Sequence, residues 1–318
     1  MFLATVVGPT GSGKSAFALR LAEHFGGEIV NCDSLQLYCG FDIGTAKTLP
    51  PDRRAIPHHL FDVLTPQESY SAGEYAREAR KVIAEITARR HLPIVVGGTG
   101  FYLRALLEGL PLLPGRDERL RERLLDRERL RPGRLHRILT RLDPGAAGRI
   151  HAHDVQKTIR ALEVRLLTQR ALPPPAEARA LEGYAVIKLG LDPDRTALQQ
   201  RLEARTRAMF EQGLIEEVKG LLASGAAGNE KPFESLGYKQ ALLHLRGALT
   251  LEQAVESTII ETRQYAKRQR TWFRRDPEIR WLAGFGEDAE IITQAIQAVI
   301  SGGGGPSLHR RCGDARVH

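Results

Sequence analysis

A glycine-rich segment near the N-terminus constrains this chain more than any other feature. Residues 8–15, Gly-Pro-Thr-Gly-Ser-Gly-Lys-Ser, match the pattern G-x-x-x-x-G-K-[ST] at every fixed position. An apolar run over residues 2–7 precedes the segment, and a helical pattern over residues 15–25 follows it. The glycines let backbone N–H groups point at one anion, Lys14 adds a positive charge, and the start of the helix adds its dipole. The chain is therefore expected to fold around a phosphate-binding loop (P-loop).

The P-loop alone does not specify which phosphate compound binds. Ser15 is placed to ligate Mg²⁺ beside a phosphate. Kinases and NTPases usually add an acidic residue after an apolar strand to hold the metal, but the run over residues 93–96 ends in Gly-Gly-Thr-Gly instead. The acid that follows a strand in this half of the chain is Asp33. Asp33 could hold water on Mg²⁺ or act as a base, and its spacing leaves both roles open.

Short apolar runs alternate with helical patterns through the first hundred residues. The runs over residues 2–7, 28–31 and 93–96 predict strands. Ser71 and Glu74 have the spacing of a capping box and predict a helix over residues 71–90. Alternating strands and helices are typical of an α/β fold with a parallel sheet.

The pattern changes at about residue 114. Residues 116–141 hold ten Arg against five acidic residues, and their leucines recur at helical spacing, with a break at residues 132–133. Helical patterns continue to about residue 169. We therefore expect a helical insertion domain over residues 114–182, between two parts of a catalytic core at 1–113 and 183–300.

The second part of that core carries its own signals. Residues 184–191 and 279–282 predict two more strands, and residues 194–223 predict one long helix. Thr250 lies three residues before Gln253 and predicts the start of a helix that runs to about residue 274. The glycine-rich tail over residues 301–318 is expected to be disordered.

Composition limits the class of protein. The net charge of +8 and the sequence pI of about 9.6 favour a polyanionic partner such as nucleic acid. Three cysteines without motif spacing argue against a disulfide scaffold and a zinc site. The N-terminus lacks the features of a signal peptide, and no apolar run is long enough to span a bilayer. We expect a cytoplasmic protein that does not enter a membrane.

Several further blocks of the sequence are distinctive when taken together with the P-loop. They are NCDSLQLYCGFDIGTAK (31–47), PHHLFDV (57–63), YSAGEY (70–75), VVGGTGFYLRALLEGL (95–110), DVQKTIRALEV (154–164), SLGYKQ (235–240) and TRQYAKRQRTWFR (262–274). In this order they resemble one family, the tRNA dimethylallyltransferases, also called tRNA isopentenyltransferases. The resemblance covers nearly the whole chain, to about residue 282, and the tail lacks a Cys/His-rich finger, so the chain resembles the bacterial members.

The resemblance implies a P-loop NTPase-like fold that binds dimethylallyl diphosphate in place of a nucleoside triphosphate. It implies transfer of the dimethylallyl group to N6 of the adenosine immediately 3′ of the anticodon, in tRNAs that read codons beginning with U. The expected cofactor is Mg²⁺. The expected partners are the tRNA anticodon stem-loop and the diphosphate, and the chain is expected to act as a monomer.

The resemblance also assigns roles to residues of this chain. Asp33 matches the base that contacts the adenine N6, and Thr99 matches a residue near the reacting centre, so both are expected to be catalytic. The residues expected to bind the diphosphate are Gly8, Thr10, Gly11, Ser12, Gly13, Lys14, Ser15 and Arg205. The residues that match tRNA-contact positions are Asp33, Ser34, Leu35, Gln36, Thr99, Arg121, Gln156, Lys157, Thr158, Ile159 and Arg160.

The predicted helix over residues 250–274 has a cationic face. Arg263, Lys267, Arg270 and Arg274 fall at helical spacing on one side. Such a face commonly lies in solvent, but the resemblance favours contact with the tRNA backbone. Arg263, Lys267 and Arg270 are therefore added to the expected tRNA contacts.

Two alternatives belong to other functional classes. A P-loop kinase acting on a small metabolite or nucleotide would consume ATP. An RNA-binding regulator with a vestigial P-loop would bind RNA tightly without turnover. Neither accounts for the blocks around Asp33, residues 44–47 and residues 97–99 together.

Overall fold

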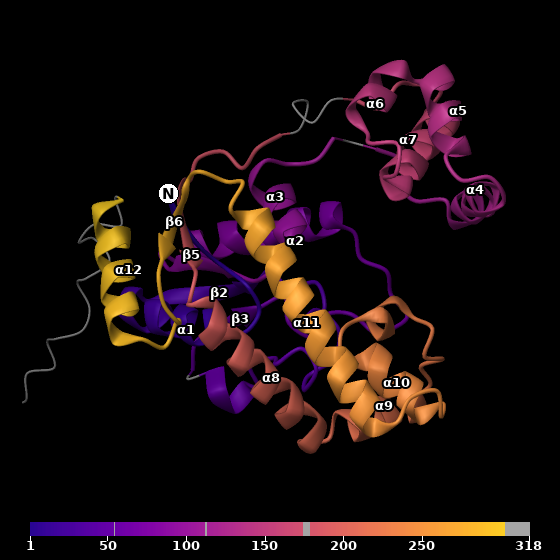
Figure 1. The fold of residues 1–318 in the computed structure, drawn as a ribbon. Coiled ribbons are helices and arrows are strands. Elements are labelled where there is room, and N and C mark those ends of the chain that lie inside the picture. The colour runs from indigo at the N-terminus through magenta and orange to yellow at the C-terminus, as the bar shows by residue number, and fades with distance from the viewer. Residues whose placement is uncertain (54, 112, 174–178, 303–318) are drawn as a thin grey trace, which may run out of the picture. The chain divides into compact units, whose positions relative to one another are not determined.

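The computed structural model describes residues 1–53, 55–111, 113–173 and 179–302. The chain separates into two compact units, drawn in Figure 1. The larger unit combines Met1–Leu107 with Leu181–His318, and the smaller unit is Glu108–Ala180. The second unit is thus inserted into the sequence of the first. Most of the tail expected to be disordered, residues 303–318, lies outside the described residues.

One parallel sheet of six strands forms the centre of the larger unit, in the order β3-β2-β4-β1-β5-β6. All of its neighbouring strands run parallel. The five strands predicted from apolar runs are confirmed, whereas the two-residue edge strand β3 was not predicted. The strands are β1 (Phe2–Val7), β2 (Gly27–Asn31), β3 (His58–His59), β4 (Leu92–Val96), β5 (Ala185–Leu191) and β6 (Ile279–Leu282).

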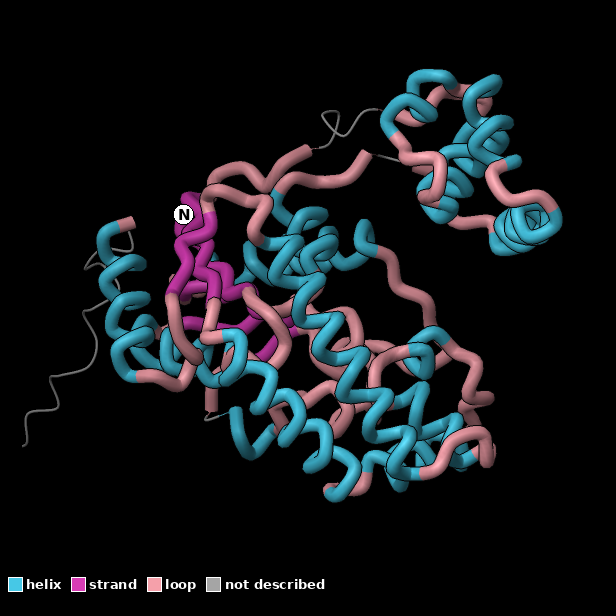
Figure 2. Tube along the Cα trace, viewed as in Figure 1, coloured by secondary structure: helices cyan, strands magenta, loops and turns pink. Residues whose placement is uncertain are grey.

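Helices cover this sheet, as the tube in Figure 2 shows. Side chains alternate between the two faces of a strand, so Ile29 and Ile94 join one apolar cluster with α1 and α12, whereas their neighbours Val30 and Val95 do not belong to it. Helix α2 packs against β2 and β4. The helices of this unit are α1 (Lys14–Phe25), α2 (Ala72–Ala88), α3 (Gly100–Leu107), α8 (Arg195–Glu211), α9 (Leu214–Ala223), α10 (Tyr238–Leu245), α11 (Leu251–Phe273) and α12 (Ala289–Ser301).

Both predicted capping boxes are confirmed, at Ser71 for α2 and at Thr250 for α11. The prediction of one long helix over residues 194–223 is wrong. The chain breaks between α8 and α9 at Gly213, which has φ of +105°. A left-handed residue cannot continue a right-handed helix, so Gly213 ends one helix and precedes the next. Helix α12 was not predicted.

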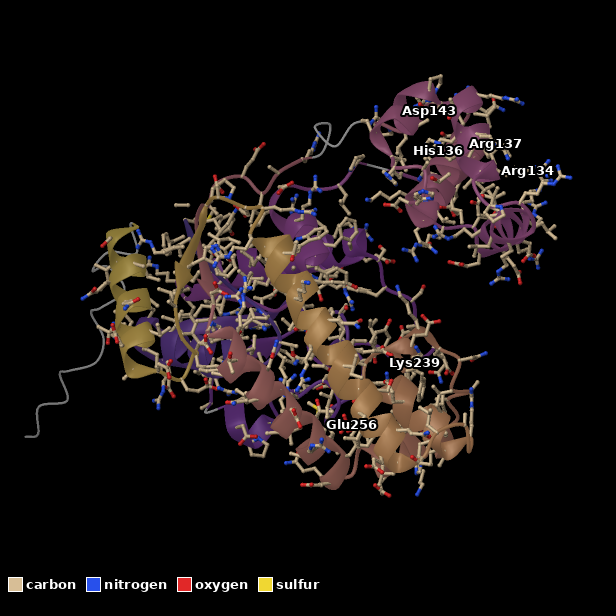
Figure 3. The ribbon with its side chains drawn as sticks, in the orientation of Figure 1. Arg134, His136, Arg137, Asp143, Lys239 and Glu256 are labelled. Carbon is tan, nitrogen blue, oxygen red and sulfur yellow. The ribbon has the colours of Figure 1, made fainter. Side chains whose placement is uncertain are left out.

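The smaller unit is helical and has its own apolar core. The break predicted near residues 132–133 is confirmed, because Gly133 precedes α5 with φ of +78°. Leu135, Leu139 and Leu162 are fully buried in the core. Arg134 and Arg137 are exposed on α5 and are labelled in Figure 3. The helices are α4 (Glu118–Leu130), α5 (Arg134–Leu142), α6 (Pro144–Arg149) and α7 (Val155–Thr168).

No helix within the described ranges combines the length and the apolar character that spanning a membrane requires.

Candidate active site

The P-loop connects β1 to α1 at the carboxyl edge of the sheet. Gly8, Gly11 and Gly13 have φ of +145°, +80° and +86°, a region that residues with a Cβ rarely adopt. Space is also short, because a Cβ on Gly13 would lie 2.3 Å from a carboxylate oxygen of Glu287. The glycines of the motif are therefore required both by backbone conformation and by close packing.

Two backbone donors of the P-loop already have partners. The N–H of Thr10 donates to Oε1 of Gln269 at 2.7 Å, and the N–H of Ser12 donates to the carbonyl of Pro9 at 3.3 Å. The side chain of Ser12 is fully buried. The N–H groups in the first turn of α1, from Lys14 onward, have no partner within the helix and are the donors that a bound anion would meet.

Two cations flank the loop. Lys14 Nζ donates to the carbonyl of Pro9 at 2.8 Å, and Arg205 Nη2 donates to the hydroxyl of Thr10 at 2.7 Å. Burial lowers the pKa of Lys14 to about 8, although the Asp33 carboxylate acts in the opposite direction. Burial and the neighbouring Arg201 lower the pKa of Arg205 to about 10. Both groups are thus partly desolvated cations, which a bound anion would stabilise.

Asp33 lies just past the end of β2, at the same edge of the sheet. The N–H of Cys32 donates to the carbonyl of Val96 at 2.7 Å and extends the pairing with β4. One carboxylate oxygen of Asp33 accepts the N–H of Leu35 at 2.9 Å. The backbone N–H of Asp33 donates to Oδ1 of Asn31 at 2.8 Å. These bonds fix the backbone around Asp33.

Thr99 packs beside the Asp33 segment. Its hydroxyl oxygen accepts the backbone N–H of Ser34 at 3.1 Å, and its own N–H donates to the carbonyl of Cys32 at 3.2 Å. Gly97 allows this approach, because a Cβ there would lie 2.1 Å from the Cys32 carbonyl oxygen. The glycine-rich loop after β4 and the segment after β2 therefore form one hydrogen-bonded structure.

One cavity of about 320 Å³ joins these parts. Its polar lining includes P-loop residues, Asp33 and Arg205, and its apolar lining includes Ile29 and Phe61. Of the predicted site residues, those that line it are Thr10, Gly11, Gly13, Lys14, Ser15, Asp33, Gln36 and Arg205. Lys14 and Asp33 therefore face the same space.

Sequence reasoning missed two charged residues of this cavity. Arg201 lies one helical turn before Arg205, and its guanidinium donates to both carboxylate oxygens of Glu287, at 2.6 and 3.1 Å. The spacing of four residues between the two arginines was a usable signal on α8. No local pattern marks Glu287, which follows β6 by five residues.

Residues 42–48 form a further part of the lining, through Thr45, Ala46 and Thr48. A buried lysine fixes this segment. Nζ of Lys47 lies 2.6 Å from carboxylate oxygens of both Asp42 and Asp62, and it donates to the carbonyl of Tyr38 at 2.8 Å. The Lys47 side chain is only 1% exposed, so its charge is compensated inside the protein.

Two helices hold the same segment from the other side. Glu217 of α9 accepts the backbone N–H of Ile43 at 2.9 Å, and Tyr238 of α10 accepts that of Gly44 at 3.1 Å. Tyr238 in turn donates to Glu217 at 2.5 Å. A Cβ on Gly44 would lie 2.4 Å from the Tyr238 ring. The blocks around residues 44–47 and 235–240 are therefore parts of one contact.

The expected cationic face of α11 is largely neutralised within the chain. Arg263 lies 2.6 Å from a carboxylate oxygen of Glu203, and Arg270 and Arg274 both form ion pairs with Asp192. Lys267 is exposed and forms no ion pair among the described residues. Contact of Arg263, Lys267 and Arg270 with tRNA stays a prediction, and Lys267 is the residue of this face without an ion pair among the described residues.

The cationic residues of the smaller unit that are expected to contact tRNA also form ion pairs within the chain. Arg121 and Arg160 both pair with the buried Glu163, at 3.3 and 2.6 Å, and Arg121 also donates to Gln156. Lys157 is exposed and pairs with Asp154 at 2.7 Å.

Thr158 and Ile159 belong to the same block of residues but not to the same surface. Thr158 is 1% exposed and Ile159 is 0% exposed. Ile159 is part of the apolar core of the smaller unit. The two side chains pack inward, so a contact of Thr158 or Ile159 with tRNA would be made by the backbone, and the expected tRNA contacts of residues 156–160 stay a prediction.

The residues present fit an Mg²⁺ ion that arrives with phosphate oxygens. The described residues contain no cluster of three or more His, Cys, Asp or Glu side chains that could hold a metal alone. Ser15 is exposed and, with Asp33, lines the cavity next to the P-loop. Mg²⁺ in phosphate sites usually takes one or two protein ligands together with substrate oxygens and water. Ser15 and Asp33 are the side chains placed to serve it.

Comparison with known proteins identifies relatives of this chain. Residues 36–276 match the sequence profile of a family described as IPP transferase. A tRNA dimethylallyltransferase of Solibacter usitatus is 58% identical over 304 residues, which are 94% of this chain and 98% of the relative. A protein of the same name from Koribacter versatilis is 54% identical over 301 residues, which are 93% of this chain and 97% of the relative.

Two solved structures share the fold. One is the full-length tRNA isopentenylpyrophosphate transferase of Bacillus halodurans, with a TM-score of 0.70 and 35% identity over 95% of this chain and 96% of that one. The other is a eukaryotic dimethylallyltransferase acting on tRNA, with a TM-score of 0.79 and 28% identity over 99% of this chain and 81% of that one. The predicted P-loop NTPase-like α/β fold is confirmed.

Proposed function

This chain belongs to the IPP transferase family, and we propose that it transfers a dimethylallyl group from dimethylallyl diphosphate to tRNA. The proposed acceptor is N6 of the adenosine immediately 3′ of the anticodon, in tRNAs that read codons beginning with U. The observation that carries the proposal is the shared cavity of Lys14, Arg205 and Asp33. This cavity combines cations that can bind a diphosphate with a carboxylate that can accept a proton from an amine.

The diphosphate end of the cavity suits a leaving group. When the bond between the allylic carbon and the bridging oxygen breaks, negative charge builds on the diphosphate. Lys14, Arg205 and the N–H groups at the start of α1 would stabilise that charge, and partial desolvation strengthens their effect. The same residues would bind the donor before reaction.

Asp33 suits the acceptor. The exocyclic amine of adenine is a weak nucleophile, because its lone pair is delocalised into the ring. As the bond from N6 to the allylic carbon forms, N6 must lose a proton, and the Asp33 carboxylate would accept it. We assign to Thr99 a place beside the reacting centre, supported by its hydrogen bond to Ser34. An adenine stacked in an RNA loop has to be turned out to reach such a site.

We propose Mg²⁺ as the cofactor, with Ser15 as its protein ligand and Asp33 nearby. When bound, the ion would neutralise charge on the diphosphate. Of the lining residues, Lys14 and Arg205 would still orient the donor. Apolar side chains such as Ile29 and Phe61 would keep water from the allylic carbon.

The proposed tRNA contacts follow from exposure and family resemblance. We propose that the helical insertion, residues 114–182, binds the anticodon stem-loop and that Lys267 adds a phosphate contact on α11. The chain would act as a monomer in the cytoplasm, where its substrate tRNA is found. The residues of the insertion and of the Asp33 segment that we assign to tRNA are all at least partly exposed; they are Ser34, Leu35, Gln36, Arg121, Gln156, Lys157 and Arg160.

The test separates this function from its competitors. The protein is incubated with Mg²⁺, unmodified tRNA and labelled dimethylallyl diphosphate, and the label in RNA is counted while ATP hydrolysis is followed in parallel. We expect label in RNA and no appreciable ATP hydrolysis with or without tRNA. ATP turnover stimulated by a small-molecule acceptor would support the kinase instead. Tight RNA binding without transfer of label would support the regulator.

A further inference from the structure

A buried amide on α11 touches both glycine-rich loops of the site. Gln269 is 5% exposed. Its Oε1 accepts the backbone N–H of Thr10 in the P-loop at 2.7 Å. Its Nε2 donates to the backbone carbonyl of Gly98, in the loop after β4, at 3.0 Å. One side chain thus bridges two loops that are nearly ninety residues apart in the sequence.

Two glycines after β4, Gly98 and Gly100, leave the space that α11 needs to form this bridge. A Cβ on Gly98 would lie 2.1 Å from Nε2 of Gln269, so the amide reaches the carbonyl because that residue is glycine. One turn later on α11, the Trp272 indole lies against Gly100, where a Cβ would lie 2.2 Å from the ring. Helix α11 therefore fits closely against the loop that carries Thr99.

The two bridged loops serve opposite halves of the proposed reaction. The P-loop would hold the diphosphate, and its Thr10 hydroxyl also accepts from Arg205. The second loop places Thr99 against Ser34, next to Asp33. With the diphosphate on the P-loop and the adenine beside Asp33, the separation between these loops would set the distance from the allylic carbon to the amine that attacks it.

We propose that Gln269 is a positioning residue, which holds the P-loop and the Gly98–Thr99 loop at the separation that transfer requires. The proposal rests on the proposed function. Reacting groups must approach to about 3–3.5 Å in alignment, and a displacement of about 1 Å can cost about a hundredfold in rate. A primary amide suits the task because it offers one acceptor and one donor on the same rigid group.

Two substitutions test the bridge. Gln269→Met keeps the length of the side chain and its neutrality but can neither accept from Thr10 nor donate to Gly98. Gln269→Asn keeps the amide but is one methylene shorter and cannot span both loops. The matched control is Gln297→Met, at an exposed position of α12. Single-turnover transfer is measured at saturating tRNA, donor and Mg²⁺, together with binding of inorganic diphosphate.

We expect both Gln269 variants to transfer about 10- to 100-fold more slowly, with the full amplitude of a single turnover. Inorganic diphosphate should bind within about threefold of wild type, because Lys14, Arg205 and the helix N–H groups remain. Gln297→Met should match wild type in every measurement. A merely structural role would instead lower the amplitude and the melting temperature together, with the rate constant of the active fraction unchanged.

The outcomes are separable from those of the proposed function. If wild type transfers label and either Gln269 variant does so at an unchanged rate, the positioning role is overturned. A reduced amplitude at an unchanged rate constant would overturn it as well. If wild type itself transfers no label to tRNA, the proposed function is overturned, whatever the Gln269 variants do.

Discussion

The P-loop and the segment of residues 42–48 line the same cavity but keep their shapes by different means. The P-loop owes its backbone conformation to its own residues, with three glycines at positive φ and a hydrogen bond from Ser12 to Pro9. Its remote side-chain contacts, from Gln269 and Arg205, meet it at Thr10. The segment 42–48 depends on remote partners. Lys47 is neutralised by Asp62, and Glu217 of α9 holds the backbone of Ile43.

This difference separates the two regions in physical terms. A site for a small, constant anion can be built from a short motif, because backbone N–H groups and one helix start supply most of it. The segment 42–48 instead needs side chains from several elements, such as Glu217 of α9 and Tyr238 of α10. Damage to the second region should therefore spare diphosphate binding.

The broadest expected effect comes from Lys47→Met, which should lower both stability and the rate of transfer. The substitution leaves Asp42 and Asp62 without their cation, but both are more than a third exposed and can rehydrate. We therefore expect a loss of about 3 kcal/mol in the free energy of unfolding, the lower end for a broken buried pair. Urea denaturation measures the loss, and Lys239→Met, at an exposed lysine of α10, is the control.

The same variant also tests the contrast between the regions. Under conditions where Lys47→Met is folded, it should bind inorganic diphosphate nearly as wild type does while its transfer rate falls. Equal losses of diphosphate binding and transfer would show that the two regions are not separable.

A second prediction concerns the other end of β2, where Glu28 is buried. Arg89, His59 and His91 all bond to its carboxylate. Burial would raise the pKa of the Glu28 carboxyl, but these bonds outweigh burial and lower the pKa from 4.5 to about 2. A lowered pKa stabilises the folded state above pH 4.5, and this contribution is lost as the pH falls from 4.5 toward 2.

The size of that contribution can be measured by substitution. We expect Glu28→Gln to cost about 3 kcal/mol of unfolding free energy at neutral pH, with a difference from wild type that shrinks below pH 4.5. Denaturation is followed between pH 7 and pH 3, with Glu211→Gln as an exposed control. A difference that does not change with pH would show that the charge of Glu28 is not what matters.

The smallest expected effect is that of Lys267→Gln. Each phosphate contact by a basic side chain adds about one to the slope of log affinity against log salt. If Lys267 contacts tRNA, its neutralisation should lower that slope by about one and weaken binding modestly. Lys81→Gln, at an exposed lysine of α2, serves as the control. An unchanged slope for Lys267→Gln would place that side chain in solvent.

Local signals predicted much of the fold. The P-loop, the capping boxes at Ser71 and Thr250 and five strands could be found because each depends on neighbouring residues. The break at Gly213 was missed, since the apolar pattern runs through it and a single glycine is often tolerated in a helix. Strand β3 is only two residues long and offers no periodicity to detect.

The sequence predicted those residues of the site that belong to a recognisable motif or family block. Lys14, Asp33 and Arg205 do line one cavity. Glu287 and Gln269 were missed because their partners are 86 to 259 residues away and no spacing rule connects them. A contiguous block such as residues 156–160 does not show which of its side chains are exposed, because successive residues of a helix point in different directions, and the Ile159 side chain is buried.

Asp33 gives the most direct test of the account, because it is assigned the proton transfer itself. Asn at this position keeps the size and one acceptor but cannot take a proton. At saturating tRNA, donor and Mg²⁺, we expect single-turnover transfer by Asp33→Asn to fall by about 10²- to 10⁴-fold, with tRNA and diphosphate bound nearly normally. A rate within a few-fold of wild type, or recovery of the rate by excess Mg²⁺, would contradict the assignment of Asp33 as the base.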